Sequence, residues 1–336
     1  MKQMTYVEAL REALKEEMER DENVFILGEE VALHGGCFGI TSGLLSQFGE
    51  NRVIDSPLSE SVIAGACVGA SFMGMRPVGE IMFADDLTIS MDQLINSAAK
   101  ARYLYNGTNG APMVMRAANG ATGTGAGPHH SQSLEALFVH IPGFIVVMPS
   151  TPADAKGLLK SSIRCDDPVI FLEPKLCYFT KGPVPEGDHL VPLGKADVKR
   201  EGKDLTVVAT GAMVPKALAA AETLQKDGVS VEIVDPRTLK PLDKTTIFNS
   251  VKKTGKLIIV EEACKTASFG GHIAAIVAEE AFHHLKAPIG RVAAPDTPIP
   301  ASKHLESFLY RMKARSLMPF EKSFHNKGKW TYGYRD

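Results

Sequence analysis

The sequence predicts an α/β protein of two domains, each built on a mostly parallel β-sheet. Short, continuously apolar segments, typical of buried parallel strands, alternate with segments of helical periodicity. The alternation lapses in a stretch rich in Pro, Gly and charged residues, 182–203. We expect a first domain at 1–185, a linker at 186–203, a second domain at 204–320 and a tail at 321–336. A length of 336 residues agrees with two domains of ordinary size.

The first domain begins with a clear helix signal. Thr5 and Glu8 have the spacing of a capping box, and apolar residues recur at helical intervals from Val7 onward. Thr151 and Pro152 mark another helix start, because a capping residue precedes a proline at the first helical position. We expect strands at 24–28, 52–57, 76–83, 112–117, 143–149 and 167–174, and helices from 5 onward and at 60–74, 85–105, 131–140 and 152–164.

The same alternation resumes in the second domain. Its apolar segments are short and contain many β-branched residues, as strands do. The first of its helices is closed by Gly228, a residue suited to the end of a helix. We expect strands at 205–210, 229–235, 256–262 and 291–296, and helices at 213–227, 243–253 and 271–285.

Composition excludes several classes of function. The chain has 37 Lys and Arg against 39 Asp and Glu, a net charge of −2, and lacks basic runs that would bind nucleic acid or an anionic membrane. Its apolar runs fall far short of the ~20 residues of a membrane helix, and its charged N-terminus lacks a signal-peptide core. Five cysteines without a CxxC motif favour reduced thiols. We expect a cytoplasmic protein, or one in a matrix-like compartment after removal of a transit peptide.

The sequence contains none of the common nucleophile, metal or nucleotide motifs. The first candidate for a functional segment is instead a glycine-rich loop, 119–133. Its glycines would let a ligand approach the backbone closely; the alternative is a flexible surface loop. His129 and His130 end the loop. A histidine there can transfer protons near neutral pH, and the alternative is a solvated side chain without a task.

Glu60 is the second candidate. It follows Ser59, a residue suited to capping a helix, and therefore falls in the first helical turn. One hypothesis is a surface carboxylate that complements the helix dipole. The other is a sheltered acid at the end of a strand, where ligands bind in open α/β sheets. Spacing alone leaves both open.

The order of the segments along the chain carries a family resemblance. The segments that carry it are DSPLSESVIAGACVGASFMGMRPVGEIMF, DQLINSAAKARYLYNG, HHSQSLEALFVHIPGFIVVMPSTPADAKGLL, ATGAMVPKAL, VDPRTLKPLD, VEEACKTASFGGHIAAIVAEEAF and RVAAPDTPIP. Through these segments, residues 3–318 resemble the β subunit of the thiamine-diphosphate-dependent decarboxylating component of 2-oxo acid dehydrogenase complexes. That family implies a pyrimidine-binding domain followed by a transketolase C-terminal-like domain.

The resemblance also implies roles for single residues. Glu60 matches the glutamate that activates thiamine diphosphate by hydrogen bonding to its aminopyrimidine ring. His130 matches a histidine that serves proton transfer while a lipoyl group is acylated. Met82 and Asp86 fall in the cofactor pocket, although the family usually has an aromatic residue at the position of Asp86. The alternative for Asp85 and Asp86 is a helix cap after the strand.

Further expectations concern metals and partners. The resemblance implies a potassium site made largely of backbone carbonyls, at Val114, Ser162, Ile163, Cys165 and Asp167. The sequence lacks the GDG…N segment that holds Mg²⁺ and the diphosphate, so an α subunit must supply it, in an α2β2 tetramer that serves a lipoyl-bearing acyltransferase core. The residues of several segments resemble acetoin- and pyruvate-type members more than members that act on branched-chain 2-oxo acids. The alternatives are a split transketolase-like carbon–carbon transferase and a noncatalytic assembly homologue.

Overall fold

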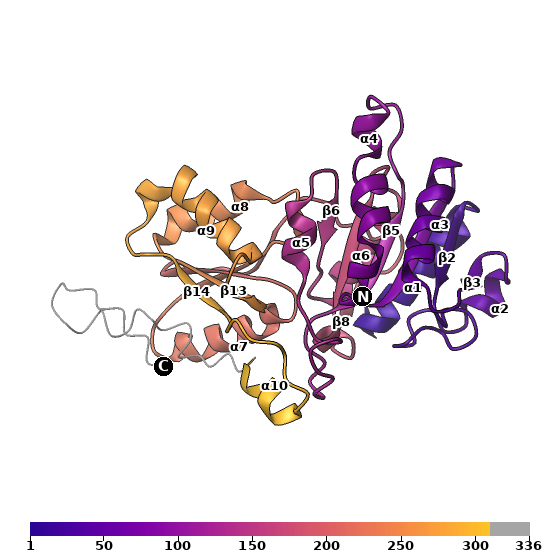
Figure 1. Ribbon diagram of the computed structural model, residues 1–336. Coiled ribbons are helices and arrows are strands. Elements are labelled where there is room, and N and C mark those ends of the chain that lie inside the picture. Colours follow the sequence, from indigo (N-terminus) through magenta and orange to yellow (C-terminus); the bar gives the residue numbers. More distant parts are fainter. Residues whose placement is uncertain (310–336) are drawn as a thin grey trace.

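The computed structural model describes residues 1–309 and confirms the α/β fold, with one seven-stranded and one five-stranded sheet (Figure 1). The N-terminal elements are β1 (Lys2–Thr5), α1 (Tyr6–Arg20), β2 (Val24–Gly28), α2 (Leu44–Phe48), β3 (Val53–Asp55), α3 (Glu60–Phe72), β4 (Arg76–Phe83), the 3₁₀ helix η1 (Asp86–Ser90), the π-helix η2 (Gln93–Ala98), α4 (Ala101–Leu104), β5 (Val114–Asn119), α5 (Glu135–His140), β6 (Ile145–Val147), α6 (Pro152–Ile163), β7 (Val169–Pro174), the 3₁₀ helix η3 (Lys175–Cys177) and β8 (Lys181–Val184).

The second half of the chain repeats the alternation of strands and helices. Its elements are β9 (Asp197–Arg200), β10 (Leu205–Ala209), α7 (Met213–Lys226), β11 (Val231–Asp235), β12 (Thr238–Lys240), α8 (Lys244–Thr254), β13 (Leu257–Cys264), α9 (Phe269–Glu280), the 3₁₀ helix η4 (Phe282–His284), β14 (Gly290–Ala294) and α10 (Lys303–Leu309). The predicted tail, 321–336, lies outside the described residues.

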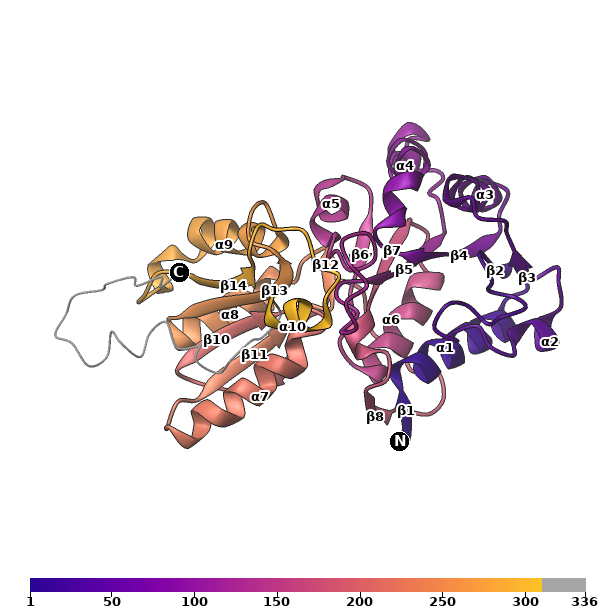
Figure 2. The same cartoon turned by 60° about the horizontal axis from the view of Figure 1, so that its bottom comes forward.

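The seven-stranded sheet has the order β12-β6-β7-β5-β4-β2-β3, and all its pairs are parallel except β12 with β6. Figure 2 shows α1 and α6 on one face of this sheet and α3, α4 and α5 on the other. The central strands are buried on both faces, and they are mostly apolar apart from Arg116 and Asn119 in β5 and Glu173 in β7. Their carboxyl ends all meet at one edge.

The five-stranded sheet has the order β14-β13-β10-β11-β9, and β9 is its antiparallel member. Strand β9 lies within the segment that we predict as a linker, 186–203. The two domains also share a sheet, because β12 comes from the second half of the chain and pairs with β6 of the first. Among residues 1–309, no helix is both long and apolar enough to cross a bilayer.

Most predicted elements are confirmed within a few residues. Helix α1 begins after Thr5, whose hydroxyl accepts from the Glu8 N–H while the Glu8 carboxylate accepts from the Thr5 N–H, as a capping box requires. Two helix predictions are wrong in detail. The segment 85–105 is divided into η1, η2 and α4, and the helix expected at 131–140 begins only at Glu135, because the preceding residues bond to Asp85 and Asn119.

Candidate active site

The carboxyl edge of the seven-stranded sheet brings the predicted site residues together. Glu60 starts α3 just after β3, and Asp86 starts η1 just after β4. The glycine-rich loop leaves β5 and returns His130 to the same edge, where its ring centroid lies 4.4 Å from that of Phe83. The negative charge of Glu60 and the imidazole of His130 both act on the pKa of Asp86. Three segments far apart in sequence therefore form one site.

Glu60 is half-buried and stands at the first position of α3, as predicted. Ser59 occupies the N-cap position, but its hydroxyl makes no capping bond; its backbone N–H donates to Glu29 Oε1 at 3.1 Å. Burial, and next the charges of Glu60 and Asp86, raise the pKa of Glu29. Within residues 1–309, the Glu60 carboxylate has neither a hydrogen bond nor an ion pair. The carboxylate is therefore free to bond to a ligand. This favours the hypothesis of a sheltered acid over that of a surface carboxylate that only complements the helix dipole.

Asp86 lies beside Glu60 in this site. Burial is the main cause that raises the pKa of the Asp86 carboxyl, and the negative charge of Glu60 raises it further, while His130 opposes the change. Two acids therefore share one edge of the sheet with one imidazole. Met82, half-buried near the end of β4, adds a flexible apolar side chain next to Phe83 in sequence.

The alternative that Asp85 is a helix cap holds only for its place: it stands at the N-cap position of η1, but its side chain makes no capping bond. Its Oδ1 atom accepts hydrogen bonds from Gln132 instead, from the side-chain Nε2 at 2.8 Å and from the backbone N–H at 3.3 Å. Its Oδ2 atom is buried without a partner among the described residues. The bonds fasten the residues after His130 to the end of β4. The orphaned oxygen leaves one acceptor for a donor from outside residues 1–309.

Lys175 is a site residue that sequence analysis missed. It follows β7, is buried, and donates to the Ala118 carbonyl at 3.3 Å, while its ammonium lies 5.2 Å from the centroid of the Phe83 ring. Burial lowers the pKa of Lys175 to about 8, against the opposing charges of Asp85 and several other acids. Phe83 thus contacts both His130 and Lys175. The available signal was a lone lysine directly after an apolar strand.

The glycine-rich loop is not a free surface loop, so that alternative is wrong. Its backbone N–H groups donate to Glu306 of α10 and to Glu262 of β13, both from the second half of the chain. His129 and His130 are both exposed, and Phe83 makes a ring contact with His130. The loop therefore joins the predicted site to the C-terminal domain.

The residues predicted for potassium gather where α6 ends. The carbonyl oxygens of Ile163 and Cys165 both accept hydrogen bonds from Arg76 Nη1, at 3.1 and 3.0 Å. Asp167, two residues further on, pairs with Arg102. These carbonyls already face a cation, and a carbonyl oxygen has two lone pairs, so each keeps one for a second cation. Ser162 and Val114, the other predicted members, are buried in α6 and β5. A carbonyl-bound monovalent ion at this place stays a prediction.

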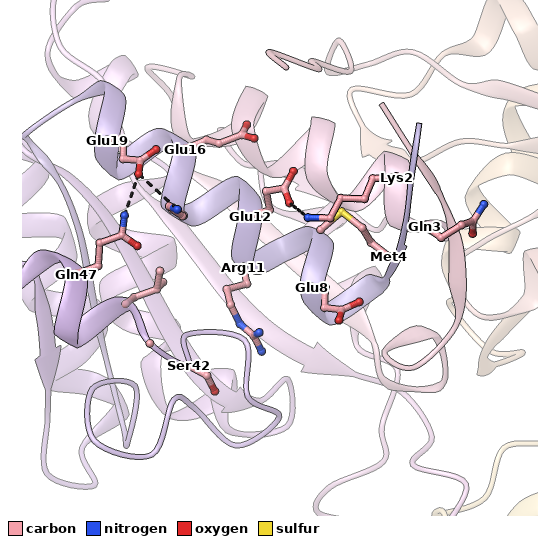
Figure 3. A pocket seen from close by; sticks show the side chains of 13 residues that line it. Lys2, Gln3, Met4, Glu8, Arg11, Glu12, Glu16, Glu19, Ser42 and Gln47 are labelled. Carbon is pink, nitrogen blue, oxygen red and sulfur yellow. Dashed lines mark hydrogen bonds and ion pairs between the residues drawn. The ribbon is translucent and has the colours of Figure 1, made fainter. Parts of the chain in front are cut away.

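No group of three or more His, Cys, Asp or Glu side chains within residues 1–309 could hold a metal ion. A hollow of about 630 Å³ does open on the outer face of α1, but it contains none of the predicted site residues (Figure 3). Several of its polar side chains bond to one another, as Lys2 does to Glu12 and Gln47 does to Glu19. It is therefore separate from the predicted site.

Comparison with known proteins first defines the class. The pyrimidine-binding domain of transketolase matches residues 2–180, and the C-terminal domain of transketolase matches residues 194–315. A solved structure titled split gene transketolase, inactive beta4 tetramer, has a TM-score of 0.76 and covers 94% of this chain and 95% of its own, at 22% identity. This likeness shows the fold. The chain is a transketolase-type protein with both domains.

Close relatives then define the family. The 2-oxoisovalerate dehydrogenase subunit beta of Bacillus subtilis (strain 168) is 50% identical over 92% of this chain and 94% of its own. The acetoin:2,6-dichlorophenolindophenol oxidoreductase subunit beta of the same organism is 46% identical over 89% and 91%. The pyruvate dehydrogenase E1 component subunit beta of Rickettsia felis (strain ATCC VR-1525 / URRWXCal2) is 46% identical over 90% and 93%. The chain belongs to the family of β subunits of thiamine-diphosphate-dependent 2-oxo acid and acetoin dehydrogenases, which confirms the predicted resemblance.

Proposed function

We propose that this chain is the β subunit of a thiamine-diphosphate-dependent dehydrogenase that cleaves acetoin or decarboxylates a 2-oxo acid and passes the acyl group to a lipoyl domain. The observation that carries the proposal is the Glu60 carboxylate, half-buried at the carboxyl edge of the sheet and without a partner among residues 1–309. A sheltered carboxylate suits proton sharing with a bound ring nitrogen. The family membership supports the same assignment.

Each site residue has a role that its position supports. Glu60 would share a proton with the aminopyrimidine ring nitrogen, holding it at a carboxyl oxygen and donating it in a hydrogen bond to that nitrogen. Met82 supplies apolar contact to that ring, and Asp86 provides a second carboxyl beside Glu60. The exposed His130 ring holds and releases a proton where an incoming lipoyl group can reach it. When bound, thiamine diphosphate supplies the carbon nucleophile and the electron sink.

The remaining parts of the site come from partners. Because the sequence has no GDG…N segment, we assign the Mg²⁺ ion and the diphosphate contacts to an α subunit, in an α2β2 tetramer. The acyl acceptor is a lipoyl-bearing acyltransferase core, and the complex is cytoplasmic. Potassium, bound by carbonyls of the predicted set, would tie the end of α6 to the neighbouring strands. That set is Val114, Ser162, Ile163, Cys165 and Asp167.

A first experiment tests the cofactor assignment. Glu60→Gln, in the chain co-expressed with its α subunit, should still assemble and bind thiamine diphosphate with Mg²⁺. Exchange of the thiazolium proton with deuterium, followed by NMR after an acid quench, should slow by about 100-fold or more, the usual contribution of a positioned proton-transfer group. Glu50→Gln, an exposed acid, is the control and should exchange normally. A wild-type exchange rate in Glu60→Gln would show that Glu60 has another role.

A second experiment separates the half-reactions and names the substrate. Acetoin, pyruvate and branched-chain 2-oxo acids are each supplied with an artificial electron acceptor, and then with a lipoyl domain. His130→Ala should reduce acylation of the lipoyl domain more than the reaction with the artificial acceptor. Equal losses would indicate a broader structural role. Cofactor binding without turnover on any of these substrates would favour the transferase, and failure to bind cofactor would favour the noncatalytic homologue.

A further inference from the structure

The backbone N–H groups of the glycine-rich loop converge on one carboxylate from the far end of the chain. Glu306 Oε1 accepts from the Thr122 N–H at 2.9 Å, from the Thr122 hydroxyl at 3.2 Å and from the Gly123 N–H at 3.2 Å. Glu306 Oε2 accepts from the Gly125 N–H at 2.6 Å. The side chain is 1% exposed although it belongs to α10, a helix on the molecular surface. Figures 1 and 2 both show α10 beside the loop that precedes α5.

The backbones of the two segments are fitted to each other. Gly125 has a φ of +86°, and a Cβ atom there would lie 2.6 Å from the Lys303 nitrogen and 2.9 Å from the Ser302 carbonyl carbon. Gly127 has a φ of +85°, and its Cβ would lie 3.3 Å from that of Ala301. Both glycines are therefore needed for the conformation of the loop and for the close approach of α10.

Two more contacts attach the loop to the second domain. The Ala121 N–H donates to the buried carboxylate of Glu262 in β13. The Ala121 methyl group packs against Ala294 at the end of β14 in a small apolar cluster that includes Leu309 of α10. These contacts hold the first half of the loop, and Glu306 holds its middle.

The same loop carries His130. The His130 N–H donates to the Gly127 carbonyl at 3.4 Å, and the base of the loop is closed by a bond from the Gly120 N–H to the Gln132 carbonyl at 2.9 Å. The His130 ring itself is exposed, so burial does not fix its position; its ring contact is with Phe83. The backbone of the loop therefore determines where the imidazole stands.

We propose that Glu306 is a positioning residue of the acyl-transfer reaction: it locks the glycine-rich loop in the conformation that places His130 at the active-site edge. The inference rests on the proposed role of His130. By this link the C-terminal domain sets the geometry of the site without touching the substrate. A carboxylate is suited to the task, since its two oxygens can accept all four donors and charged hydrogen bonds are strong.

Hydrogen–deuterium exchange of the assembled enzyme tests the lock independently of catalysis. Glu306→Ala should speed exchange of the amides in the segment 121–127 by about tenfold or more, since it removes several charge-assisted bonds. Glu306→Gln, which keeps one acceptor oxygen, should give a smaller increase. His304→Ala, an exposed position on the same helix, is the control and should leave the segment unchanged. Unchanged exchange in both Glu306 variants would overturn the proposal, and Glu306→Gln serves alone if Glu306→Ala does not assemble.

Kinetics of the same variants test the link to His130. Acylation of a lipoyl domain by Glu306→Ala should lose about as much kcat as His130→Ala loses, while the reaction with an artificial electron acceptor keeps its kcat and KM. Combining both substitutions should cost little more than His130→Ala alone. Faster loop exchange with normal acylation would overturn the positioning role. If His130→Ala itself acylates normally, the proposed function of His130 fails instead, whatever the loop exchange shows.

Discussion

Three carboxylates are buried where the two domains meet, and one of them, Glu135, should make the stability of the protein depend on pH. Glu135, on α5, is 1% exposed, and its Oε2 atom has only a long bond of 3.4 Å from Asn119 Nδ2. Burial, and then the negative charges of Glu261 and Glu262 in β13, raise the pKa of Glu135 from 4.5 to about 7. The folded protein therefore binds a proton there that the unfolded chain releases.

The direction and size of the effect follow from this difference. Between pH 4.5 and about 7, the folded state holds more protons at Glu135 than the unfolded state, so stability falls as pH rises. Below this window Glu135 is protonated in both states, so it does not lower the free energy of unfolding. Above the window Glu135 is ionised in both states, and its burial lowers the free energy of unfolding by about 3 kcal/mol, the equivalent of the full rise in pKa. Glu135→Gln removes the charge at every pH, so the variant should gain stability mainly above neutral pH.

Thermal unfolding of the assembled enzyme measures this gain. The variant should exceed the wild type by about 1 kcal/mol at pH 5.5 and by about 3 kcal/mol at pH 8, an increase of several degrees in Tm. Glu50→Gln, at an exposed position, should show neither the gain nor its pH dependence. A difference between Glu135→Gln and wild type that is the same at both pH values, or a loss of stability at pH 8, would refute the reasoning.

Two further substitutions test the buried Arg116 and the tight turn at Gly143. Arg116→Met should lower the free energy of unfolding by about 3–5 kcal/mol, because it strands the buried carboxylates of Glu80 and Glu173, each 2.7 Å from the guanidinium; a denaturant titration that shows less than 1 kcal/mol would contradict this. Gly143→Ala should cost at least about 1–3 kcal/mol by the same measurement, because its φ is +101° and the new Cβ would overlap the Ala99 carbonyl oxygen; a wild-type midpoint would contradict it.

The sequence predicted the parallel strands and long helices because their signals are local. The capping box at Thr5 and the apolar run of β7 each lie within a few residues of chain. The edge strands β9 and β12 were missed, because each has only three or four residues and its pairing partner lies elsewhere in the chain. The segment 85–105 was predicted as one helix, but it contains 3₁₀, π and α turns that periodicity does not distinguish.

The residues of the candidate site likewise fall into two groups: those with a local sequence signal, and those that come together only in the folded chain. The placement of Glu60 followed from the order of strand, cap and helix, all within ten residues. The contact of Phe83 with both His130 and Lys175 joins the ends of β4, β5 and β7 and exists only once the sheet has formed. Glu306 lies still further away, more than 170 residues from the loop that it binds. No spacing rule connects a lone glutamate near residue 306 to glycines near residue 125.

The glycine-rich loop bears on the assembly of the whole enzyme. A loop whose N–H groups converge is a natural anion site, and phosphate groups are bound in this way in many proteins. Here the converging N–H groups of Thr122, Gly123 and Gly125 are already bonded to Glu306, and that of Ala121 to Glu262. Donors occupied by the chain's own carboxylates cannot also bind a diphosphate. These four donors are therefore not available to a diphosphate, which agrees with the proposed assignment of the phosphate contacts to an α subunit.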